Sequence, residues 1–189
     1  IESDLINQLS GKRLLSEVKL LLKEPDPVRC VDRMKKFSLL QFFAPDISND
    51  DSCWLVMKKI DSVLIWSKMI SMPKKPETWL VYFLGLFVAV KDAVFEQAVE
   101  RLRFPVKISN RMRSDREHFI KARRGLNEGR EPGPSEIYDI FSELSAEAVI
   151  LLLAACSSER VNKYAALYFN QYYTLAKTKL TGDDLIEMG

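Results

Sequence analysis

The sequence has few of the residues on which most metal sites and many catalytic sites depend. Of its 189 residues only one is a histidine, His118, and the three cysteines, Cys30, Cys53 and Cys156, lie far apart. Structural zinc sites need clustered thiolates and imidazoles, so this spacing argues against a zinc-binding protein. An odd number of scattered cysteines instead indicates small buried or half-buried thiols in a reducing compartment.

Long apolar runs are also missing. The longest extends from Trp79 to Val90, is interrupted only by Gly85, and is too short to span a bilayer. The first residues do not follow the basic, apolar and small-residue order of a secretory signal. We therefore expect a cytoplasmic protein with no membrane partner.

No stretch of strand length alternates between apolar and polar residues. The apolar residues recur at helical spacing almost everywhere, as at Leu14, Val18 and Leu22. No Gly-rich phosphate loop follows a strand pattern, and no repeat of fixed period suggests a solenoid. The sequence therefore predicts an all-α fold with no sheet.

Helix-start and helix-stop residues divide the chain into predicted helices. Asp26 before Pro27 is a start signal, and Ser145 and either Ser157 or Ser158 can each cap a helix. Gly11 either bends the first helix or marks its start. The predicted helices cover residues 4–23, 27–37, 50–69, 94–102, 108–126, 145–154 and 158–176, with a strongly apolar, centrally buried helix from Pro76 and a short one from Pro134.

The predicted helix over residues 108–126 has the clearest charge pattern. Its apolar stripe should face the core and consists of Ile108, Met112, Phe119, Ala122 and Leu126. The candidate RNA-binding residues on and just before this helix are Lys107, Arg111, Arg113, Arg116, Lys121, Arg123 and Arg124. Guanidinium groups donate in a fork that matches two phosphate oxygens, which favours RNA contact. The alternative is a solvated face that is salt-bridged to acidic residues such as Glu96, Glu100 or Glu128.

Two further patterns favour a structural role. The aromatic residues Tyr164, Tyr168, Phe169, Tyr172 and Tyr173 could stack on bases, but their three- and four-residue spacing is what a packed helix needs. Arg13 and Glu17 are four residues apart, and we expect them to form a structural ion pair on one side of the first helix. Asp115 lies on the apolar side of its helix and can reach Arg111 in the same way.

Three sequence motifs along the chain resemble, in the same order, motifs of one known family. Residues 9–20 read Leu-Ser-Gly-Lys-Arg-Leu-Leu-Ser-Glu-Val-Lys-Leu, and residues 180–189 read Leu-Thr-Gly-Asp-Asp-Leu-Ile-Glu-Met-Gly. Residues 39–46 read Leu-Leu-Gln-Phe-Phe-Ala-Pro-Asp, with Ser38 where the family usually has glycine. These are similar to the neck, a middle turn and the start of the tail in bacterial class II tRNA nucleotidyltransferases, which include the CCA-adding and A-adding enzymes and their poly(A) polymerase relatives.

The resemblance implies an elongated multi-helix neck and body. Residues 1–48 would be the lower neck, residues 49–178 an RNA-binding helical body, and residues 179–189 the beginning of the tail. The partner would be tRNA, whose acceptor arm is recognised by its backbone and shape because duplex RNA hides its base edges in a deep, narrow groove. Further RNA contacts are expected from residues near the tail phrase, namely Lys177, Lys179, Thr181 and Gly182.

The catalytic motifs of that family are missing from this sequence. Neither the Gly-Ser turn followed by an Asp-x-Asp pair nor the Glu-Asp-x-x-Arg motif is found. We therefore expect no catalytic residues, no metal site and no cofactor in this chain, and no activity from it alone; Mg²⁺ with ATP or CTP would act in a head domain. Asp50–Asp51 and Asp183–Asp184 are better explained as acidic residues at helix starts.

Two other functions remain open on the residues alone. One is an all-helical scaffold that binds protein and has no nucleic-acid role, for which an exposed apolar groove is expected. The other is a complete small enzyme whose site the sequence does not reveal, for which a polar cavity with displaced pKa values is expected. The sequence does not distinguish an A-adding from a CCA-adding parent, because the nucleotide-selecting residues would lie upstream.

Overall fold

The computed structural model describes residues 8–45, 47, 51–70, 72–127 and 131–173, and every regular element in them is helical. The all-α prediction is therefore confirmed for these residues. The helices are α2 (Gly11–Leu21), α3 (Pro27–Lys36), α4 (Asp51–Ser67), α5 (Thr78–Leu86), α6 (Asp92–Leu102), α7 (Val106–Asn127), α8 (Pro134–Ser142), α9 (Ala146–Cys156) and α10 (Glu159–Leu167), with short helical turns η1 (Leu39–Phe42) and η3 (Tyr168–Tyr172).

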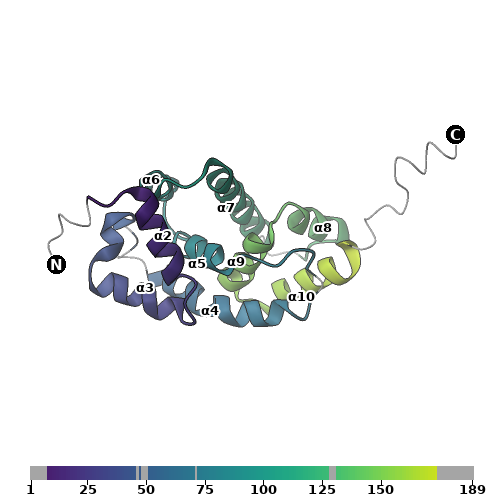
Figure 1. The fold of residues 1–189 in the computed structure, drawn as a ribbon. Coiled ribbons are helices and arrows are strands. Elements are labelled where there is room, and N and C mark those ends of the chain that lie inside the picture. The colour runs from purple at the N-terminus through teal and green to yellow at the C-terminus, as the bar shows by residue number, and fades with distance from the viewer. Residues whose placement is uncertain (1–7, 46, 48–50, 71, 128–130, 174–189) are drawn as a thin grey trace, which may run out of the picture.

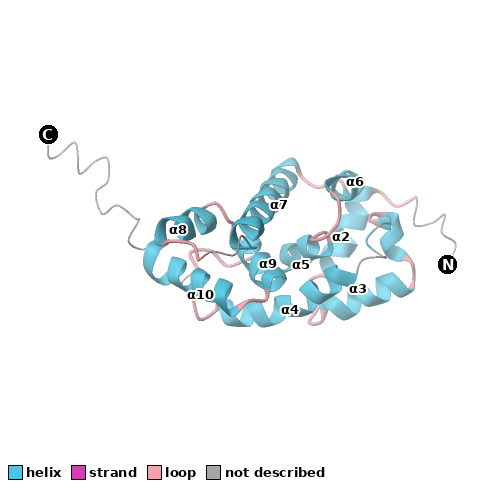
Figure 2. Cartoon of the chain, turned by 180° about the vertical axis from the view of Figure 1, so that it is seen from behind, coloured by secondary structure: helices cyan, strands magenta, loops and turns pink. Residues whose placement is uncertain are grey.

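The helices are laid out along one long axis. Figure 1 shows α2 and α3 at one end, α8 and α10 at the other, and α5 and α9 between them. Figure 2 shows the same order from behind, with α4 along one edge and α7 along the opposite edge. The elongated shape expected from the resemblance is present. No described helix combines the length and the apolar character that a membrane crossing requires.

Side-chain caps form at three helix starts, and those at Asp26 and Ser145 are the predicted ones. The Ser10 hydroxyl oxygen accepts a hydrogen bond from the backbone N–H of Arg13 at 3.3 Å, and the Asp26 carboxylate accepts one from Arg29 at 3.0 Å. The Ser145 hydroxyl accepts one from the N–H of Ala148 at 3.1 Å. Such bonds satisfy amides that have no partner inside the helix.

The ends of several predicted helices differ from the structure by a few residues, as in α4, which spans residues 51–67 rather than 50–69. The first described helix begins at Gly11, so glycine marks a start there rather than a bend. The last predicted helix was expected to continue to Ala176; the chain stays helical through α10 and the π-helical turn η3 to Tyr172, and residues 174–176 lie outside the described part. Residues beyond 173, which include the predicted tail, lie outside the described part of the chain, and the domain boundaries stay predictions.

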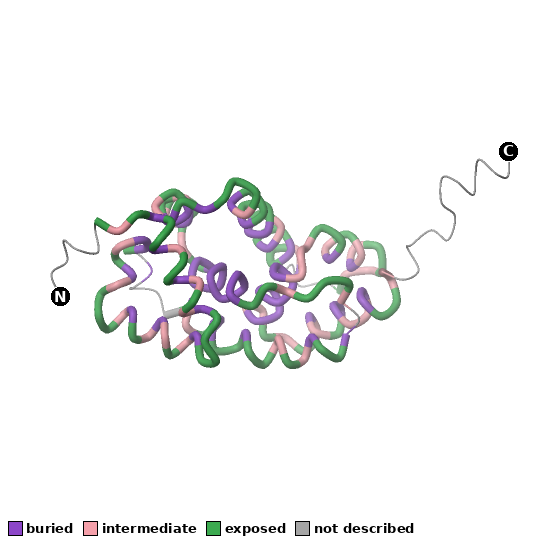
Figure 3. Tube along the Cα trace, in the orientation of Figure 1, coloured by how far each residue is buried: buried purple, intermediate pink, exposed green. Residues whose placement is uncertain are grey.

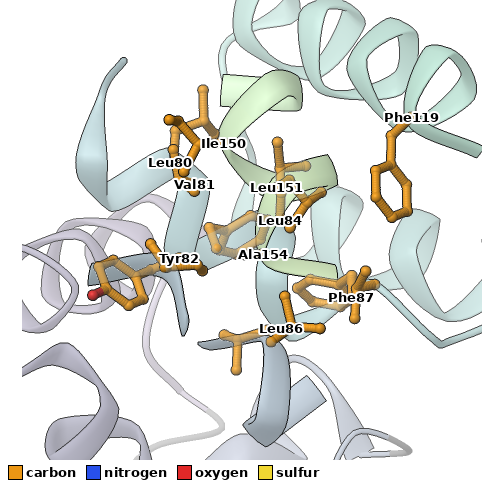
Figure 4. Packing of buried hydrophobic residues seen from close by; sticks show 14 of the residues in the cluster. Leu80, Val81, Tyr82, Leu84, Leu86, Phe87, Phe119, Ile150, Leu151 and Ala154 are labelled. Carbon is orange, nitrogen blue, oxygen red and sulfur yellow. The ribbon is translucent and has the colours of Figure 1, made fainter. Parts of the chain in front are cut away.

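Helices α5 and α9 form the centre of the core. Their residues are buried nearly all round, as the purple tube in Figure 3 shows, because α5 packs on both α4 and α9 while α9 also contacts α7. Figure 4 shows Leu84 of α5 beside Leu151 of α9, with Phe119 reaching in from α7. The predicted central position of the apolar helix is confirmed. Fully burying such a side chain stabilises a fold by about 1.5–3 kcal/mol.

Among the described residues, three that are not glycine have left-handed backbone conformations, and each lies just after the end of a helix. They are Ser38 (φ 56°), Arg103 (φ 54°) and Ser157 (φ 49°). In this region the Cβ atom of an L-residue crowds the following carbonyl oxygen, so glycine is favoured. The conformation of Ser38 explains why the resembling family usually has glycine at that position.

Gly11 is required by a close approach of two backbones. A Cβ atom at this position would collide with the carbonyl oxygen of Arg101 at the end of α6 and would lie 2.7 Å from Cγ of Arg103. The guanidinium of Arg101 also donates to the carbonyl oxygen of Leu9, with both N–O distances at 3.4 Å. The start of α2 is therefore seated directly on the end of α6.

Replacing Gly11 with alanine should destabilise this junction. Because the added methyl group meets backbone rather than a flexible side chain, we expect Gly11→Ala to lower the free energy of unfolding by about 1–3 kcal/mol. Gly125→Ala in α7 is the matched control, since its new Cβ would approach only Ile140, at 3.9 Å. Alanine is the better helix former, so the control should gain up to about 1 kcal/mol. Urea unfolding of both variants measures the difference, and equal stabilities would contradict the close approach.

Candidate nucleic-acid interface

Helix α7 places its apolar stripe against the core as predicted. Met112, Phe119, Ala122 and Leu126 are buried, and Ile108 is partly buried against the same cluster. Asp115 lies among them with 4% of its surface exposed. The basic residues of the helix, however, do not share one environment.

Arg116 is buried, although the sequence pattern placed it on an open basic face. Its Nε atom donates to the Asp92 carboxylate at 2.8 Å, and its two terminal nitrogens donate to the carbonyl oxygens of Phe87 and Val90. The guanidinium also lies over the Phe95 ring, 5.3 Å from its centre. Arg116 therefore fastens α7 to the connection between α5 and α6, and its expected exposure is wrong because a long side chain can turn inward to satisfy distant carbonyl groups.

Arg111 is committed to three carboxylates. Its guanidinium pairs with Glu147, lies 3.6 Å from Glu77, and lies 3.8 Å from Asp115, which confirms the expected reach to Asp115. Glu147 is 1% exposed and also accepts a hydrogen bond from the backbone N–H of Glu77 at 2.7 Å. A buried carboxylate needs such partners, because transfer from water without them costs several kcal/mol.

Burial raises the pKa of Asp115 above its usual range. A hydrogen bond from Ser145 and the charge of Arg111 lower it in part, whereas the charge of Glu147 raises it further. The acidic cluster of Glu77, Asp115 and Glu147 surrounds an arginine and is therefore already matched to a cation. Within the part of the chain that the structure describes, no group of three histidine, cysteine, aspartate or glutamate side chains could hold a metal ion.

Arg113 and Lys121 form ion pairs at the surface. The Nε and Nη2 atoms of Arg113 donate to the Glu96 carboxylate at 2.9 and 2.7 Å, and Lys121 lies 2.7 Å from Glu143. The salt-bridged alternative therefore holds for Arg113, with the Glu96 partner expected, and for Lys121 with an unexpected one. Exposed pairs of this kind contribute only about 0–1 kcal/mol, so these cations can exchange partners with little loss.

Lys107, Arg123 and Arg124 are exposed and have no hydrogen-bond or ion-pair partner among the described residues. Lys107 lies in the first turn of α7, and the two arginines lie near its other end. At a rise of 1.5 Å per residue, the two ends of this set are roughly 24 Å apart. Among the candidate residues of α7, these three are the most available to a ligand.

The remaining candidate residues are placed as follows. Tyr164, Tyr168 and Phe169 are buried, so the core-packing interpretation of the tyrosine pattern is confirmed for them. Burial raises the pKa of Tyr168 to about 12. Arg13 and Glu17 form no ion pair with each other among the described residues, contrary to expectation. The RNA contacts expected near the tail phrase lie outside the described residues and stay predictions: Lys177, Lys179, Thr181 and Gly182.

One family model matches the N-terminal quarter of the chain. It is described as "Probable RNA and SrmB-binding site of polymerase A" and matches residues 2–50. In the structure this range contains α2, α3 and η1, including the close contact of Gly11 with α6. The match concerns helices that contact α6 and α4 rather than α7 itself.

A curated relative matches along the whole chain. The A-adding tRNA nucleotidyltransferase of Geobacter sulfurreducens is 31% identical over 193 aligned residues, which cover 100% of this chain and 22% of the relative. The chain thus spans about a fifth of the length of that enzyme.

Solved structures share the fold at lower identity. The CCA-adding enzyme of Thermotoga maritima complexed with tRNA superimposes with a TM-score of 0.71 at 19% identity, over 100% of this chain and 45% of that one. A CCA-adding enzyme with ATP superimposes with a TM-score of 0.71 at 19% identity, over 97% of this chain and 43% of that one. At these identities the likeness concerns the fold.

Arg116 should matter for stability and Arg124 should not. Replacing Arg116 with glutamine leaves the Phe87 and Val90 carbonyl oxygens without their donor, and each orphaned buried group costs about 1–3 kcal/mol. Arg124→Gln removes an exposed charge, so its effect should stay within about 0.5 kcal/mol. Thermal unfolding followed by circular dichroism compares the two variants. A small effect of Arg116→Gln would show that its buried bonds contribute little.

Asp115 should make stability depend on pH. Its folded pKa is raised above the unfolded value near 3.9, so the folded state binds the proton more tightly. Its contribution is therefore largest below about pH 4 and is lost as the pH rises through the folded pKa. Asp115→Asn removes this titration, so the variant should gain stability relative to the parent between pH 4 and 7. Urea titrations at several pH values measure this, and parallel curves would refute it.

Proposed function

We propose that this chain is the tRNA-binding helical portion of a tRNA nucleotidyltransferase. In this role it holds the acceptor arm of tRNA so that the 3′ end reaches a catalytic head domain, which adds A or CCA. The observation that supports this most strongly is the alignment with the A-adding relative along the full length of this chain. The RNA-binding family model over residues 2–50 supports the same role.

Recognition rests on backbone and shape. Side chains cannot read sequence in the deep groove of duplex RNA, so a positioning module needs cations spaced along the phosphates. Lys107 at one end of α7 and Arg123 and Arg124 at the other supply such cations without breaking any bond of the fold. Arg113 and Lys121 can join them by exchanging a surface carboxylate for a phosphate.

Rigid placement of these cations is what positions the RNA. Arg116 and Arg111 fix α7 to α5, α6 and α9 through buried groups, so the free cations project from an anchored helix. Holding a substrate end in a fixed place lowers the entropic cost of reaction, even when the holding residues are far from the chemistry. Two arginines of α7, Arg111 and Arg116, therefore anchor the helix to the rest of the fold. Arg123 and Arg124 are available to contact the RNA.

Nucleotide transfer itself belongs to other parts of the enzyme. Mg²⁺ with ATP or CTP would be held by acidic residues of the head domain, and the described residues of this chain offer no cluster suited to that metal. The residues of this chain bind and orient the RNA. The cytoplasm, where tRNA is processed in bacteria, is the compartment that we propose for the protein.

A protein partner is a second candidate for the N-terminal helices. The matching family model names a protein as well as RNA for residues 2–50. Within this range, Leu20 of α2 and Phe37 at the end of α3 are large apolar side chains that are 60% and 64% exposed. A protein that docks here would leave the free cations of α7 open to RNA.

The free cations of α7 can be tested together. Changing Lys107, Arg123 and Arg124 to glutamine should weaken tRNA binding by this chain and flatten its salt dependence, because each lost phosphate contact removes about 0.7–0.9 from the log–log slope. Glutamine keeps the helix propensity close to that of arginine and lysine, so the helix should remain intact. Fluorescence anisotropy with labelled tRNA at several salt concentrations measures both quantities.

The control variant removes the same charge from another edge of the molecule. Lys58 and Lys68 are exposed on and just after α4, which α9 separates from α7, and Lys74 follows in the next loop. Changing these three to glutamine should leave binding close to that of the parent. If both triple variants lost affinity equally, the effect would come from net charge alone, and α7 would not be the interface.

A further inference from the structure

The start of α2, the end of α6 and the first turns of α7 line an open cleft of about 760 Å³. Three arginines line it, Arg101 and Arg103 from the end of α6 and Arg113 from α7, together with a single carboxylate, that of Glu100. Residues of two separate elements, the end of α6 and α7, thus bring positive charge to one cleft. The sequence pattern did not single out Arg101 or Arg103.

The backbone of Arg103 has a left-handed conformation, which is unfavourable for an arginine. It follows the last residue of α6 with φ 54° and ψ 48°, and its N–H donates to the carbonyl oxygen of Glu100 at 3.2 Å. Glycine or asparagine is the usual residue in this left-handed position, because a side chain there costs about 1 kcal/mol. Stability alone therefore does not account for an arginine at the end of α6.

No interaction of the Arg103 guanidinium with the described residues offsets the cost of this backbone conformation. The side chain is exposed and has no hydrogen-bond or ion-pair partner among the described residues. Its stem crosses the position where Gly11 lacks a Cβ atom, so a larger residue at 11 would push it aside. The missing side chain at Gly11 thus leaves room for Arg103, whose guanidinium makes no hydrogen bond or ion pair with the described residues.

The two neighbouring arginines each have a hydrogen-bond partner in the fold. Arg101 is anchored to the carbonyl oxygen of Leu9, and Arg113 is held by both oxygens of Glu96. Their positive charge contributes to the cleft, whereas part of their donor set is used in these bonds. Arg103 is the arginine of the cleft whose full donor set is available.

We propose that Arg103 binds a backbone phosphate of the RNA, with Arg101 and Arg113 providing the surrounding positive field. This inference rests on the proposed function and extends it from α7 to the junction with α2, the helix that the RNA-binding family model matches. A guanidinium donates in a fork that fits two phosphate oxygens, which an ammonium does not reproduce. An open cleft, unlike an enclosed pocket, admits one phosphate of a continuous polymer.

Changing Arg103 to glycine separates binding from folding. The substitution removes the guanidinium and at the same time relieves the left-handed conformation, so the melting temperature should rise while the tRNA affinity falls. We expect a roughly three- to tenfold weaker affinity at low salt and a log–log salt slope reduced by about 0.7–0.9. Arg103→Lys keeps the charge but loses the fork, and its affinity should fall between those of the parent and Arg103→Gly.

Two controls isolate the two effects. Ser38→Gly relieves a similar left-handed conformation, φ 56°, without changing the charge, so it should raise the melting temperature and leave tRNA binding unchanged. Lys58→Gln removes one exposed charge from α4 and should change neither property by much. Arg103→Gly should be the one variant of the three in which stability rises and affinity falls.

The outcomes distinguish this inference from the proposed function. If the parent chain binds tRNA and Arg103→Gly binds it with the same affinity and salt slope, the cleft is not a phosphate site, although the proposed function stands. If the parent does not bind tRNA, the proposed function fails, and inorganic tripolyphosphate serves as the probe. A tripolyphosphate-induced rise in melting temperature that is present in the parent and absent in Arg103→Gly would still support the site, whereas equal rises or none would overturn it.

Discussion

The arrangement of the molecule depends on one buried carboxylate. Glu147 lies in the otherwise apolar helix α9 with almost no exposed surface, and there it must find partners for its charge. It accepts a hydrogen bond from the backbone N–H of Glu77 at the start of α5 and forms an ion pair with Arg111 of α7. Because α5 and α9 form the centre of the core and α7 packs on α9, satisfying this single group fixes the start of α5 and the register of α7 against α9.

The basic helix follows from that constraint. Once Arg111 is drawn to Glu147 and Arg116 to the Phe87 and Val90 carbonyl oxygens, two positive groups of α7 belong to its support. The others remain at its surface, either in exchangeable pairs or without partners. A helix that is anchored by some of its arginines can present the rest at fixed positions, and fixed positions are what recognition of a rigid duplex by shape requires.

The sequence predicted the local features of the fold well because they depend on neighbours in the chain. The caps at Asp26 and Ser145 and the apolar stripe of α7 each involve residues a few positions apart. The candidate site was predicted less completely because its partners are distant in sequence. Angular position on a helix gives the direction in which Arg116 leaves the backbone, but not the carbonyl groups 26 and 29 residues away towards which it turns. The cleft at Arg103 combines three such distant segments.

The contact between Gly11 and the end of α6 has a consequence for how related sequences can vary. Gly11 meets the main-chain oxygen of Arg101, an atom that every residue type carries. A substitution at position 101 therefore leaves the obstacle in place and needs no compensating change at position 11. Paired substitutions, the signal from which contacts are inferred in alignments, should be absent here although the two backbones touch. The constraint should appear only as a single invariant glycine, with its cause visible in three dimensions alone.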